Sequence, residues 1–328
     1  MGEETEETGQ TKACQLSDLS GLGDKSIERL NSIGIYSVRQ LALYNKTEIL
    51  DYLSDFDPPR LTRALHQARA ICFPPRTYTG EEKEKGVRGL DRLPSGLRNL
   101  DALLGGGLAQ TFIYELVGEY GVGKTQVCHQ LAVQAHMNRW GTYYIDTENT
   151  FRIDRIAQMA QRFGLKESIE GGQLRHSVLT STPLNVDQLI DVIRIELTNA
   201  VEQKNVKLCV LDSLIAQFRS EFKGREHLAE RQQTLSYVLG WLLRAAMLYK
   251  IFVVITNHIM AQPMGYAPAK AAGGHVVEHG TTYRLFIRKE KEKFEMSVED
   301  APDLPFGASI QYTIGEGGLF EAEEKRKK

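Results

Sequence analysis

A glycine-rich stretch from residue 118 to residue 125 has the residue types and spacing that bind phosphate. It reads Gly118-Glu119-Tyr120-Gly121-Val122-Gly123-Lys124-Thr125 and fits the pattern G-x-x-x-x-G-K-[ST]. The glycines let consecutive backbone N–H groups turn toward one anion, and a helix that follows adds the partial positive charge of its N-terminus. The pattern therefore predicts a nucleoside triphosphate site, in which Lys124 reaches the terminal phosphates and the Thr125 hydroxyl binds Mg²⁺.

Two acids that follow apolar stretches are candidates for the chemistry of hydrolysis. Asp212 ends the apolar run 208–212, and a carboxylate at the C-terminal end of a sheet strand can hold Mg²⁺ beside a phosphate-binding loop. Glu148 follows the apolar run 142–146 and is the candidate to activate the attacking water. The alternatives are a chance acid at the end of a strand for Asp212 and a surface acid that caps the next helix for Glu148.

Further polar segments are expected at the same edge. His258 ends the run 253–258, where a polar group can sense the terminal phosphate, and its imidazole could make the activity depend on pH. Segment 260–274 is rich in Gly, Ala and Pro, which is typical of a functional loop. Segment 218–231 interleaves basic residues with Phe218 and Phe222, which suits a single-stranded nucleic acid, although a solvated charged loop is the alternative.

A sheet must bring these candidates together. Apolar runs predict strands near 112–117, 142–146, 174–179, 207–212 and 251–256, and helical spacing predicts helices near 124–138, 152–163, 185–203 and 228–248. The alternation implies a parallel sheet that is covered on both faces. Alternating patterns near 283–287, 294–298 and 309–314 predict antiparallel strands that extend the sheet edge.

The N-terminal part predicts a separate small domain. Leu19-x-Gly21-Leu22-Gly23 fits the hairpin of a helix–hairpin–helix unit, whose backbone N–H groups grip DNA phosphates without reading sequence; a plain helical turn is the alternative. A second hairpin near 55–59 lacks glycines, which predicts no phosphate grip there. We expect the following organisation: a disordered tail at 1–12, a helix–hairpin–helix domain at 13–72, a linker at 73–90 that could hold a polymerisation segment, an ATPase core at 91–322 and a basic tail at 323–328.

Composition sets the remaining limits. The chain has 328 residues, a formal net charge of -2 and 42% hydrophobic residues, so any nucleic-acid contact must come from local patches. Its four cysteines lack metal-ligand spacing, and no apolar run approaches the ~20 residues of a membrane span. A cytosolic, DNA-associated location without membrane contact is therefore expected.

The order of these motifs resembles the RecA-type recombinases, and within them the archaeal RadA proteins and their eukaryotic counterparts. The resemblance rests on the helix–hairpin–helix start, residues 100–107, 118–126, 145–152 and 218–232, Thr256-Asn257, and Gly273-Gly274-His275. It implies an α/β fold with a RecA-like P-loop ATPase core, a mostly parallel central sheet and a small all-α helix–hairpin–helix N-terminal domain.

The resemblance also implies an activity and its partners. Members of the family are DNA-dependent ATPases that form filaments on single-stranded DNA and exchange strands with a homologous duplex during recombinational repair. ATP and Mg²⁺ are the implied cofactors. Single- and double-stranded DNA bound without sequence preference, further copies of the chain in a filament or ring, and recombination mediators are the implied partners.

The same resemblance carries roles over to particular residues. Catalysis falls to Glu148, Lys124 and His258, nucleotide binding to 118–126 together with Arg155 at adenine and His279 across the subunit interface, and metal binding to Thr125 and Asp212. DNA binding falls to Gly21, Gly23, Arg219, Lys223, Arg225, Arg231, Lys270, Gly273 and Gly274.

The chain departs from the family pattern in four places. His258 stands where the family usually has Gln, and Ala267–Ala271 lacks the Asp-Pro-x-x-Pro cap over the neighbour's ATP. The linker shows no clear Phe-x-x-Ala plug, and the loop between the P-loop helix and the next strand is short. These departures leave a second interpretation open, a paralogue that assists recombinase assembly with little strand exchange of its own. A third interpretation is a regulatory ATPase of RecA fold that does not bind DNA, against which the helix–hairpin–helix start and the basic segment 218–231 argue.

Overall fold

The computed structural model describes residues 14–224, 226–260 and 270–322, which form two compact units. The first unit ends at Tyr78 and the second begins at Thr79. The two tails that we expect to be disordered lie outside the described residues.

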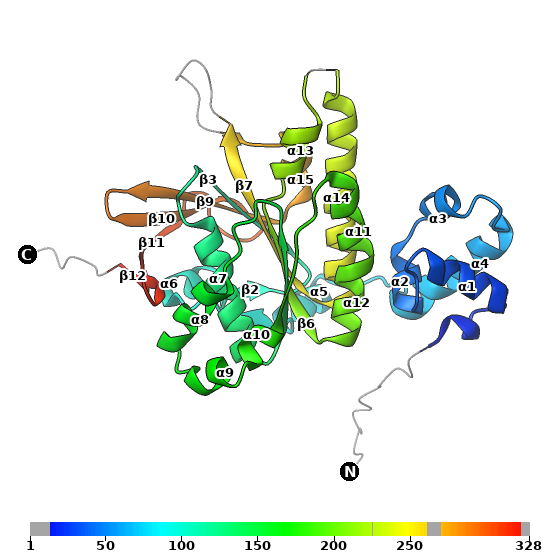
Figure 1. Cartoon of the computed structure of the whole chain (residues 1–328), viewed down its shortest axis with the longest axis horizontal. Coiled ribbons are helices and arrows are strands. Elements are labelled where there is room, and N and C mark those ends of the chain that lie inside the picture. The colour runs from blue at the N-terminus through cyan, green and yellow to red at the C-terminus, as the bar shows by residue number, and fades with distance from the viewer. Residues whose placement is uncertain (1–13, 225, 261–269, 323–328) are drawn as a thin grey trace, which may run out of the picture. The chain divides into compact units, whose positions relative to one another are not determined.

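The described part of the first unit is helical throughout (Figure 1). Its elements are η1 (Leu16–Asp18), α1 (Asp24–Ser32), α2 (Val38–Leu43), α3 (Lys46–Tyr52) and α4 (Pro58–Cys72). The Ser37 hydroxyl caps α2 by accepting from Gln40 N at 3.0 Å, and the Asp57 carboxylate caps α4 in the same way from Arg60 N. The core is formed by fully buried side chains such as Leu30, Ile35, Leu41, Ile49 and Leu61.

The predicted linker contains a helix. Helix α5 (Gly80–Arg88) begins after Thr79, whose hydroxyl accepts from Glu82 N at 3.2 Å while the Glu82 carboxylate accepts from Thr79 N. No residue of α5 is buried, so local capping and two i,i+4 ion pairs on its exposed surface support this helix.

The second unit is built on one large sheet. Its strands are β3 (Ile113–Gly118), β4 (Gly141–Asp146), β5 (Val178–Ser181), β6 (Val206–Asp212), β7 (Phe252–Met260), β8 (Lys270–Ala271), β9 (Tyr283–Glu290), β10 (Lys293–Asp300), β11 (Ser309–Gly315) and β12 (Gly318–Glu321). The order across the sheet is β12-β11-β10-β9-β3-β7-β6-β4-β5, and β8 pairs with β7. Strands β9, β3, β7, β6, β4 and β5 run parallel, which confirms the predicted parallel core.

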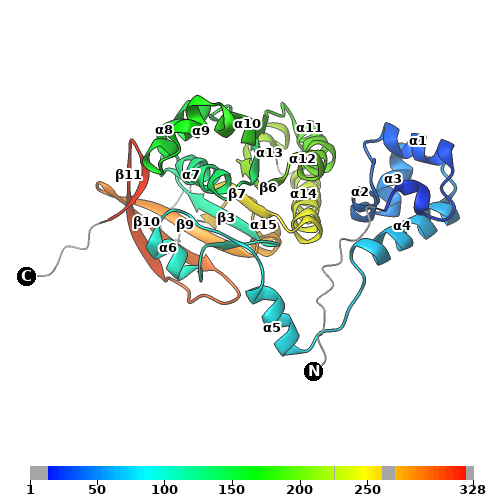
Figure 2. The same cartoon turned by 90° about the horizontal axis from the view of Figure 1, so that it is seen from below.

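The remaining elements surround that sheet. They are the two-stranded pair β1 (Arg92–Leu93) and β2 (Leu108–Ala109), and the helices α6 (Arg98–Leu103), α7 (Lys124–Met137), α8 (Ile153–Arg162), α9 (Lys166–Glu170), α10 (Gln173–Ser177), α11 (Val186–Asp191), η2 (Val192–Glu196), α12 (Leu197–Gln203), α13 (Ala216–Glu221), α14 (Leu228–Tyr249) and α15 (His275–Gly280). Figures 1 and 2 show α7 and α8 on one face of the sheet and α12 and α14 on the other. This layering buries the parallel strands on both faces, and it leaves their carboxyl ends together at one edge.

Three elements differ from the sequence-based expectation. The strand predicted at 174–179 is wrong for residues 174–177, because Gln173–Ser177 forms helix α10 and the strand β5 starts at Val178. Buried Leu174 and Val178 stand four residues apart, a spacing that fits a helical turn as well as a strand. The helix predicted at 185–203 is continuous but contains a π-helical turn, η2. Strand β9 pairs antiparallel with β10 as predicted, and also parallel with β3.

Candidate nucleotide and nucleic-acid sites

The glycine-rich loop connects the carboxyl end of β3 to the start of α7. Gly118 and Gly123 both require glycine: a Cβ on Gly118 would lie 2.4 Å from the Ile287 carbonyl oxygen, and Gly123 has φ +86°, with a Cβ there only 2.4 Å from Ile314 Cδ1. The Lys124 ammonium donates to the carbonyls of Gly118 at 2.9 Å and Glu119 at 2.7 Å. Burial lowers the Lys124 pKa, and the carboxylates of Asp212 and Glu148 oppose that shift. The loop thus holds the Lys124 amine against its own backbone, within the segment that matches the phosphate-binding pattern.

Asp212 lies at the centre of a hydroxyl cluster. Its Oδ2 accepts from Thr125 Oγ1 and from Tyr144 Oη, both at 2.7 Å, and its Oδ1 accepts from Thr256 Oγ1. These hydroxyls come from α7, β4 and β7, so three elements fix one carboxylate. Thr125 and Asp212 supply the hard oxygen donors that Mg²⁺ prefers, and this donor set fits the ion.

Glu148 is held by two donors beside this cluster. Its Oε1 accepts from Ser213 Oγ at 2.5 Å and lies 3.0 Å from His258 Nε2. The hydrogen bond from His258 lowers the pKa of Glu148, burial opposes the shift, and the bond from Ser213 adds to it. Glu148 is therefore an ionised, oriented carboxylate with its second oxygen, Oε2, engaged by neither donor.

Asp146 fixes the turn that carries Glu148, and sequence reasoning did not assign it a role. The Asp146 carboxylate accepts from the backbone N–H groups of Glu148 at 3.2 Å, Thr150 at 3.1 Å and Phe151 at 2.9 Å. Asp residues that end strands commonly organise the following turn in this way. The place of Asp146 at the end of a predicted strand was therefore the feature of the sequence that could have indicated this role.

A buried network connects the strand of His258 to the end of segment 260–274. The Asn257 amide donates to Glu115 Oε1 and to the Ala272 carbonyl, both at 2.7 Å, and the fully buried Glu115 pairs with Arg284 at 2.7 Å. Burial raises the pKa of Glu115, and Arg284 opposes that shift. Sequence reasoning missed Glu115, although an acid inside the apolar run 112–117 was a visible signal.

Arg155, which the resemblance places at adenine, and His279, which it places at the subunit interface, have different surroundings. Arg155 donates to the Gln126 side chain at 2.7 Å and to the carbonyls of Gly315 and Glu316, which connect β11 to β12. His279 is exposed on α15, with its ring 6.2 Å from that of His275. Arg155 is thus attached to the P-loop helix, whereas His279 faces outward.

The basic segment after Asp212 is partly helical. Phe218 is fully buried in α13 and stacks on Phe222 at 5.9 Å, so Phe218 offers no face to a nucleic-acid base. Arg219 and Lys223 are exposed, and Arg231 is half-buried in the first turn of α14. Arg225 lies outside the described residues. The expectation of a loop is therefore wrong for residues 218–221 of this segment, because Ile215 and Phe218 pack inward and these residues end helix α13.

Of the predicted loop 260–274, the structure describes Met260, which ends β7, and residues 270–274. Residues 261–269 and the side chain of Lys270 lie outside the described residues, and β8 returns antiparallel to β7. Gly273 and Gly274 follow with φ +97° and +61°. These left-handed conformations allow the chain to turn from β8 into α15.

The hairpin of the first unit exposes both predicted glycines. Gly21 has φ +93° with open space around it, and Gly23 precedes α1, its carbonyl accepting from Ser26 N at 2.8 Å. Among the described residues, only the 3-10 turn η1 precedes this hairpin, and Ser20 is tied to Gln67 of α4 by two hydrogen bonds. The exposed turn at a helix start is the geometry that contacts backbone phosphate.

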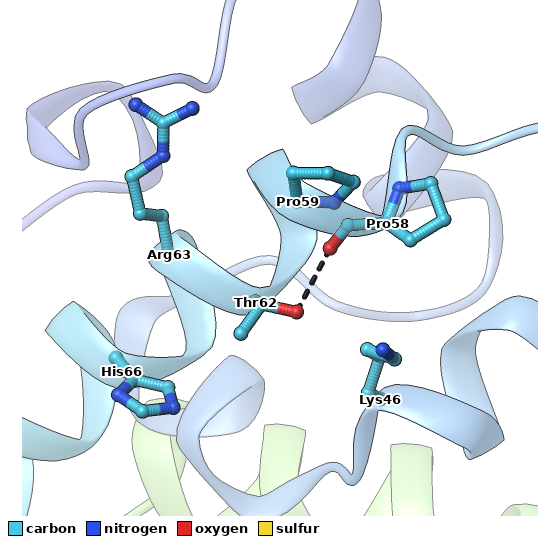
Figure 3. A pocket seen from close by; sticks show the side chains of 6 residues that line it. All are labelled: Lys46, Pro58, Pro59, Thr62, Arg63 and His66. Atoms are coloured by element: carbon cyan, nitrogen blue, oxygen red, sulfur yellow. Dashed lines mark hydrogen bonds between the residues drawn. The ribbon is translucent and has the colours of Figure 1, made fainter.

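A basic cavity lies at the second, glycine-free hairpin position (Figure 3). Its volume is about 450 Å³, and its lining consists of Lys46, Pro58, Pro59, Thr62, Arg63 and His66, with no acid among them. The Thr62 hydroxyl donates to the Pro58 carbonyl at 2.8 Å. Side-chain cations, rather than glycine backbone, therefore concentrate positive charge here, which sequence reasoning missed.

The fold and the converging site define a RecA-like P-loop protein. A model of the Rad51 family matches residues 88–322. The DNA repair and recombination protein RadA of Aeropyrum pernix is 34% identical over 94% of this chain and 97% of its own length. The protein of the same name from Metallosphaera sedula is 34% identical over 99% of this chain and 100% of its own length. The chain therefore belongs to the Rad51 family, as the motif order predicts.

The described residues contain neither a membrane-spanning helix nor a cluster of metal-binding side chains. In the parts of the chain that the structure describes, no helix is long and apolar enough to cross a membrane. Within the same residues, no group of three or more His, Cys, Asp or Glu side chains is arranged to hold a metal ion. The Thr125–Asp212 pair is a candidate of a different kind, since Mg²⁺ keeps several waters and needs few protein ligands.

Proposed function

We propose that this chain is an ATP-dependent DNA recombinase that assembles on single-stranded DNA and exchanges strands with a homologous duplex in recombinational repair. One observation carries the proposal: Lys124, Thr125, Asp212 and Glu148 meet at the carboxyl edge of the parallel sheet. Membership of the Rad51 family supports the DNA part of the proposal.

Each of these residues has a role that its contacts support. Lys124 neutralises charge on the terminal phosphates, while loop residues 118–126 and the Arg155 side chain bind the rest of the nucleotide. Thr125 and Asp212 hold Mg²⁺, which supplies further charge neutralisation when bound. Glu148 accepts the proton of the attacking water through Oε2, because Ser213 and His258 engage only Oε1.

DNA binding is proposed to use the phosphate backbone rather than base sequence. The hairpin at Gly21 and Gly23 suits duplex phosphates, and the exposed Arg219 and Lys223 suit a single strand. Arg225, Arg231, Lys270, Gly273 and Gly274 remain proposed contacts. Copies of the chain assemble into a filament or ring, with exposed His279 at the neighbour's ATP, and recombination mediators and a cytoplasmic location belong to the same proposal.

The direct test measures ATP hydrolysis by the full chain with and without single-stranded DNA, together with electron microscopy of the DNA-bound protein. Stimulation by DNA and regular filaments or rings support the proposal. Unstimulated hydrolysis without assemblies would overturn it and would favour a regulatory ATPase that does not act on DNA.

A second function is favoured by the departures from the family pattern. His258 replaces the usual Gln, and residues 267–271 lack the Asp-Pro-x-x-Pro cap. Both features concern coupling between subunits, so a paralogue that assists another recombinase is the alternative. A strand-exchange assay with the purified chain alone separates the two, because abundant exchange product excludes the assisting role.

Replacing His258 with Gln is expected to preserve DNA-stimulated ATP hydrolysis, because the Gln amide can still donate to Glu148. The measurement is the hydrolysis rate of the parent and the variant with and without single-stranded DNA. A variant that loses the stimulation by DNA would show that the imidazole itself is required.

Replacing Arg219 and Lys223 with Ala is expected to weaken single-stranded DNA binding for every sequence and to reduce its salt dependence. Removing one phosphate contact makes the slope of log K against log[salt] shallower by about 0.7 for single strands. Fluorescence anisotropy at several salt concentrations measures this slope. Arg98→Ala, an exposed cation of α6, is the matched control and should leave the slope unchanged. Equal slopes for all three proteins would contradict the assignment.

A further inference from the structure

A second polar cavity lies at the edge of the sheet opposite the nucleotide site. Its volume is about 320 Å³, and its lining consists of His136, Arg139, Trp140, Gly141, Ser168, Gln173, Ser177, Lys204 and Asn205. Gly141 begins β4 and Asp146 ends it, so the cavity and the catalytic edge are separated by the length of that strand, roughly 17 Å. The cavity is therefore distinct from the P-loop site.

The short loop after α7 shapes this cavity. Only residues 138–140 separate the end of α7 from the start of β4. Arg139 and Asn205 both adopt left-handed conformations, with φ +61° and +51°, and the Asn205 amide donates to the Arg139 carbonyl at 2.9 Å. This bond joins the turn after α7 to the turn after α12, and it brings the side chains of Arg139 and Lys204 to one cavity.

The charge of the lining is wholly positive. Arg139 and Lys204 are exposed, and within the described ranges no hydrogen bond or ion pair engages either side chain. None of the lining residues is Asp or Glu. Two cations without a counter-charge beside a polar cavity favour an anion, since charge-assisted hydrogen bonds are the stronger ones.

The floor of the cavity is an ordered chain of hydrogen bonds. His136 Nδ1 lies 2.8 Å from Ser177 Oγ, and His136 Nε2 lies 2.6 Å from Ser168 Oγ. The Ser177 hydroxyl gives its proton to the Leu174 carbonyl at 2.8 Å, so it accepts from Nδ1. His136 Nε2 then accepts the hydrogen bond from the Ser168 hydroxyl. If that hydroxyl rotates, it can donate to a bound ligand, and Nε2 can then accept a hydrogen bond from the ligand.

We infer that this cavity binds a small phosphate-bearing anion, with Arg139 and Lys204 at the rim and Ser168 at the floor. Trp140 adds an apolar wall, packed 5.3 Å from Phe252, against which an organic part of the ligand can lie. The cavity volume accommodates either free phosphate or the phosphate of a mononucleotide. The site lies outside the proposed recombinase machinery and does not depend on it.

The alternative role of the two cations is to complement helix dipoles. Arg139 stands two residues beyond the end of α7, and Lys204 directly follows α12. Cations at such positions contribute to helix stability without any ligand. Lys250 directly follows α14 and does not line the cavity, so it provides a matched control for this alternative.

Trp140 makes the test direct, because the chain has only two tryptophans. In a Trp241→Phe background, Trp140 fluorescence excited at 295 nm is titrated with inorganic phosphate at constant ionic strength, with chloride as the counter-titration. We expect a saturable change with phosphate and none with chloride. Arg139→Gln and Lys204→Gln should each weaken binding about tenfold, the loss of roughly one charged contact, and the double variant should abolish saturation.

The controls decide the outcome. Lys250→Gln should bind phosphate as the parent does, and because every variant keeps the P-loop, phosphate bound there cannot account for a difference among them. A response that is absent, that chloride reproduces or that persists in the double variant would overturn the inference. Titration with AMP identifies the source: tighter binding than phosphate assigns a nucleotide phosphate, and equal or weaker binding assigns the free ion, with either result supporting the site.

Discussion

Replacing Glu148 with Gln is expected to lower the rate of ATP hydrolysis by about 10²- to 10⁴-fold, the usual contribution of a positioned general base. Gln keeps the size of the side chain and can still accept from Ser213 through its amide oxygen. The amide cannot take a proton from water, so chemistry is lost while nucleotide binding remains. Single-turnover hydrolysis and the affinity for a fluorescent ATP analogue measure the two effects separately.

The control for this substitution is Glu170→Gln. Glu170 is an exposed acid of α9, and its only described ion pair is the 3.8 Å contact with Lys166. The control variant should hydrolyse ATP at the parental rate. If Glu148→Gln stays within a few-fold of the parent, or if it loses nucleotide binding together with hydrolysis, Glu148 is not the base and its contact with His258 is structural.

Replacing Arg284 with Met is expected to lower the free energy of unfolding by about 3–5 kcal/mol, the range for removing one partner of a buried ion pair. The Glu115 side chain is fully buried and its Oε2 lies 2.7 Å from Nε of Arg284, whose side chain is 8% exposed. Without Arg284, the carboxylate keeps only the Asn257 amide and the Thr281 hydroxyl. Urea denaturation followed by circular dichroism measures the loss.

The loss should also depend on pH. Burial raises the pKa of Glu115, and removing Arg284 removes the main opposing influence, so the folded-state pKa rises further above the unfolded value of about 4.3. A raised carboxyl pKa means that stability is retained below the unfolded pKa and is lost as pH rises through the folded pKa. The deficit of the variant should therefore be smallest near pH 4 and largest at neutral pH.

Arg288→Met is the matched control on the same strand. Arg288 pairs with Glu290 and Glu295, but its side chain is 57% exposed, so the loss should stay below about 1 kcal/mol. A double variant, Glu115→Gln with Arg284→Met, should recover part of the stability because no buried charge remains. The role of the buried pair would be contradicted if Arg284→Met and Arg288→Met lowered the free energy of unfolding equally. It would also be contradicted if the effect of Arg284→Met did not change with pH.

The same buried network bears on coupling between sites. Asn257 joins Glu115 to the Ala272 carbonyl, and the next residue along the strand, His258, contacts Glu148. Two adjacent residues of β7 therefore connect Glu148 to the end of segment 260–274, which contains the proposed DNA contacts Lys270, Gly273 and Gly274. In the Arg284→Met variant, DNA stimulation of ATP hydrolysis reports whether this connection transmits DNA binding.

The sequence alone determined the features that depend on local pattern. The residues of the P-loop, the β–α alternation and the acids after apolar runs predicted a parallel α/β core and the four residues that meet at its edge, because parallel strands place their carboxyl ends together. The order of the motifs added the resemblance to RecA-type recombinases. The glycines at 21 and 23 likewise predicted an exposed hairpin, since few residues other than glycine tolerate the positive φ found at Gly21.

Only the tertiary structure decided what depends on contacts between distant segments. Phe218 could have stacked on bases, but packing buried it. The ion pair of the buried Glu115 depends on Arg284, which lies 169 residues further along the chain. The cavity at Arg139 needs a turn from another helix, held by Asn205. The periodicity of a sequence shows which face of a helix or strand is apolar, but it does not show which polar side chains will contact each other in the fold. In this chain such contacts orient Glu148, pair the buried Glu115 and form the cavity at Arg139.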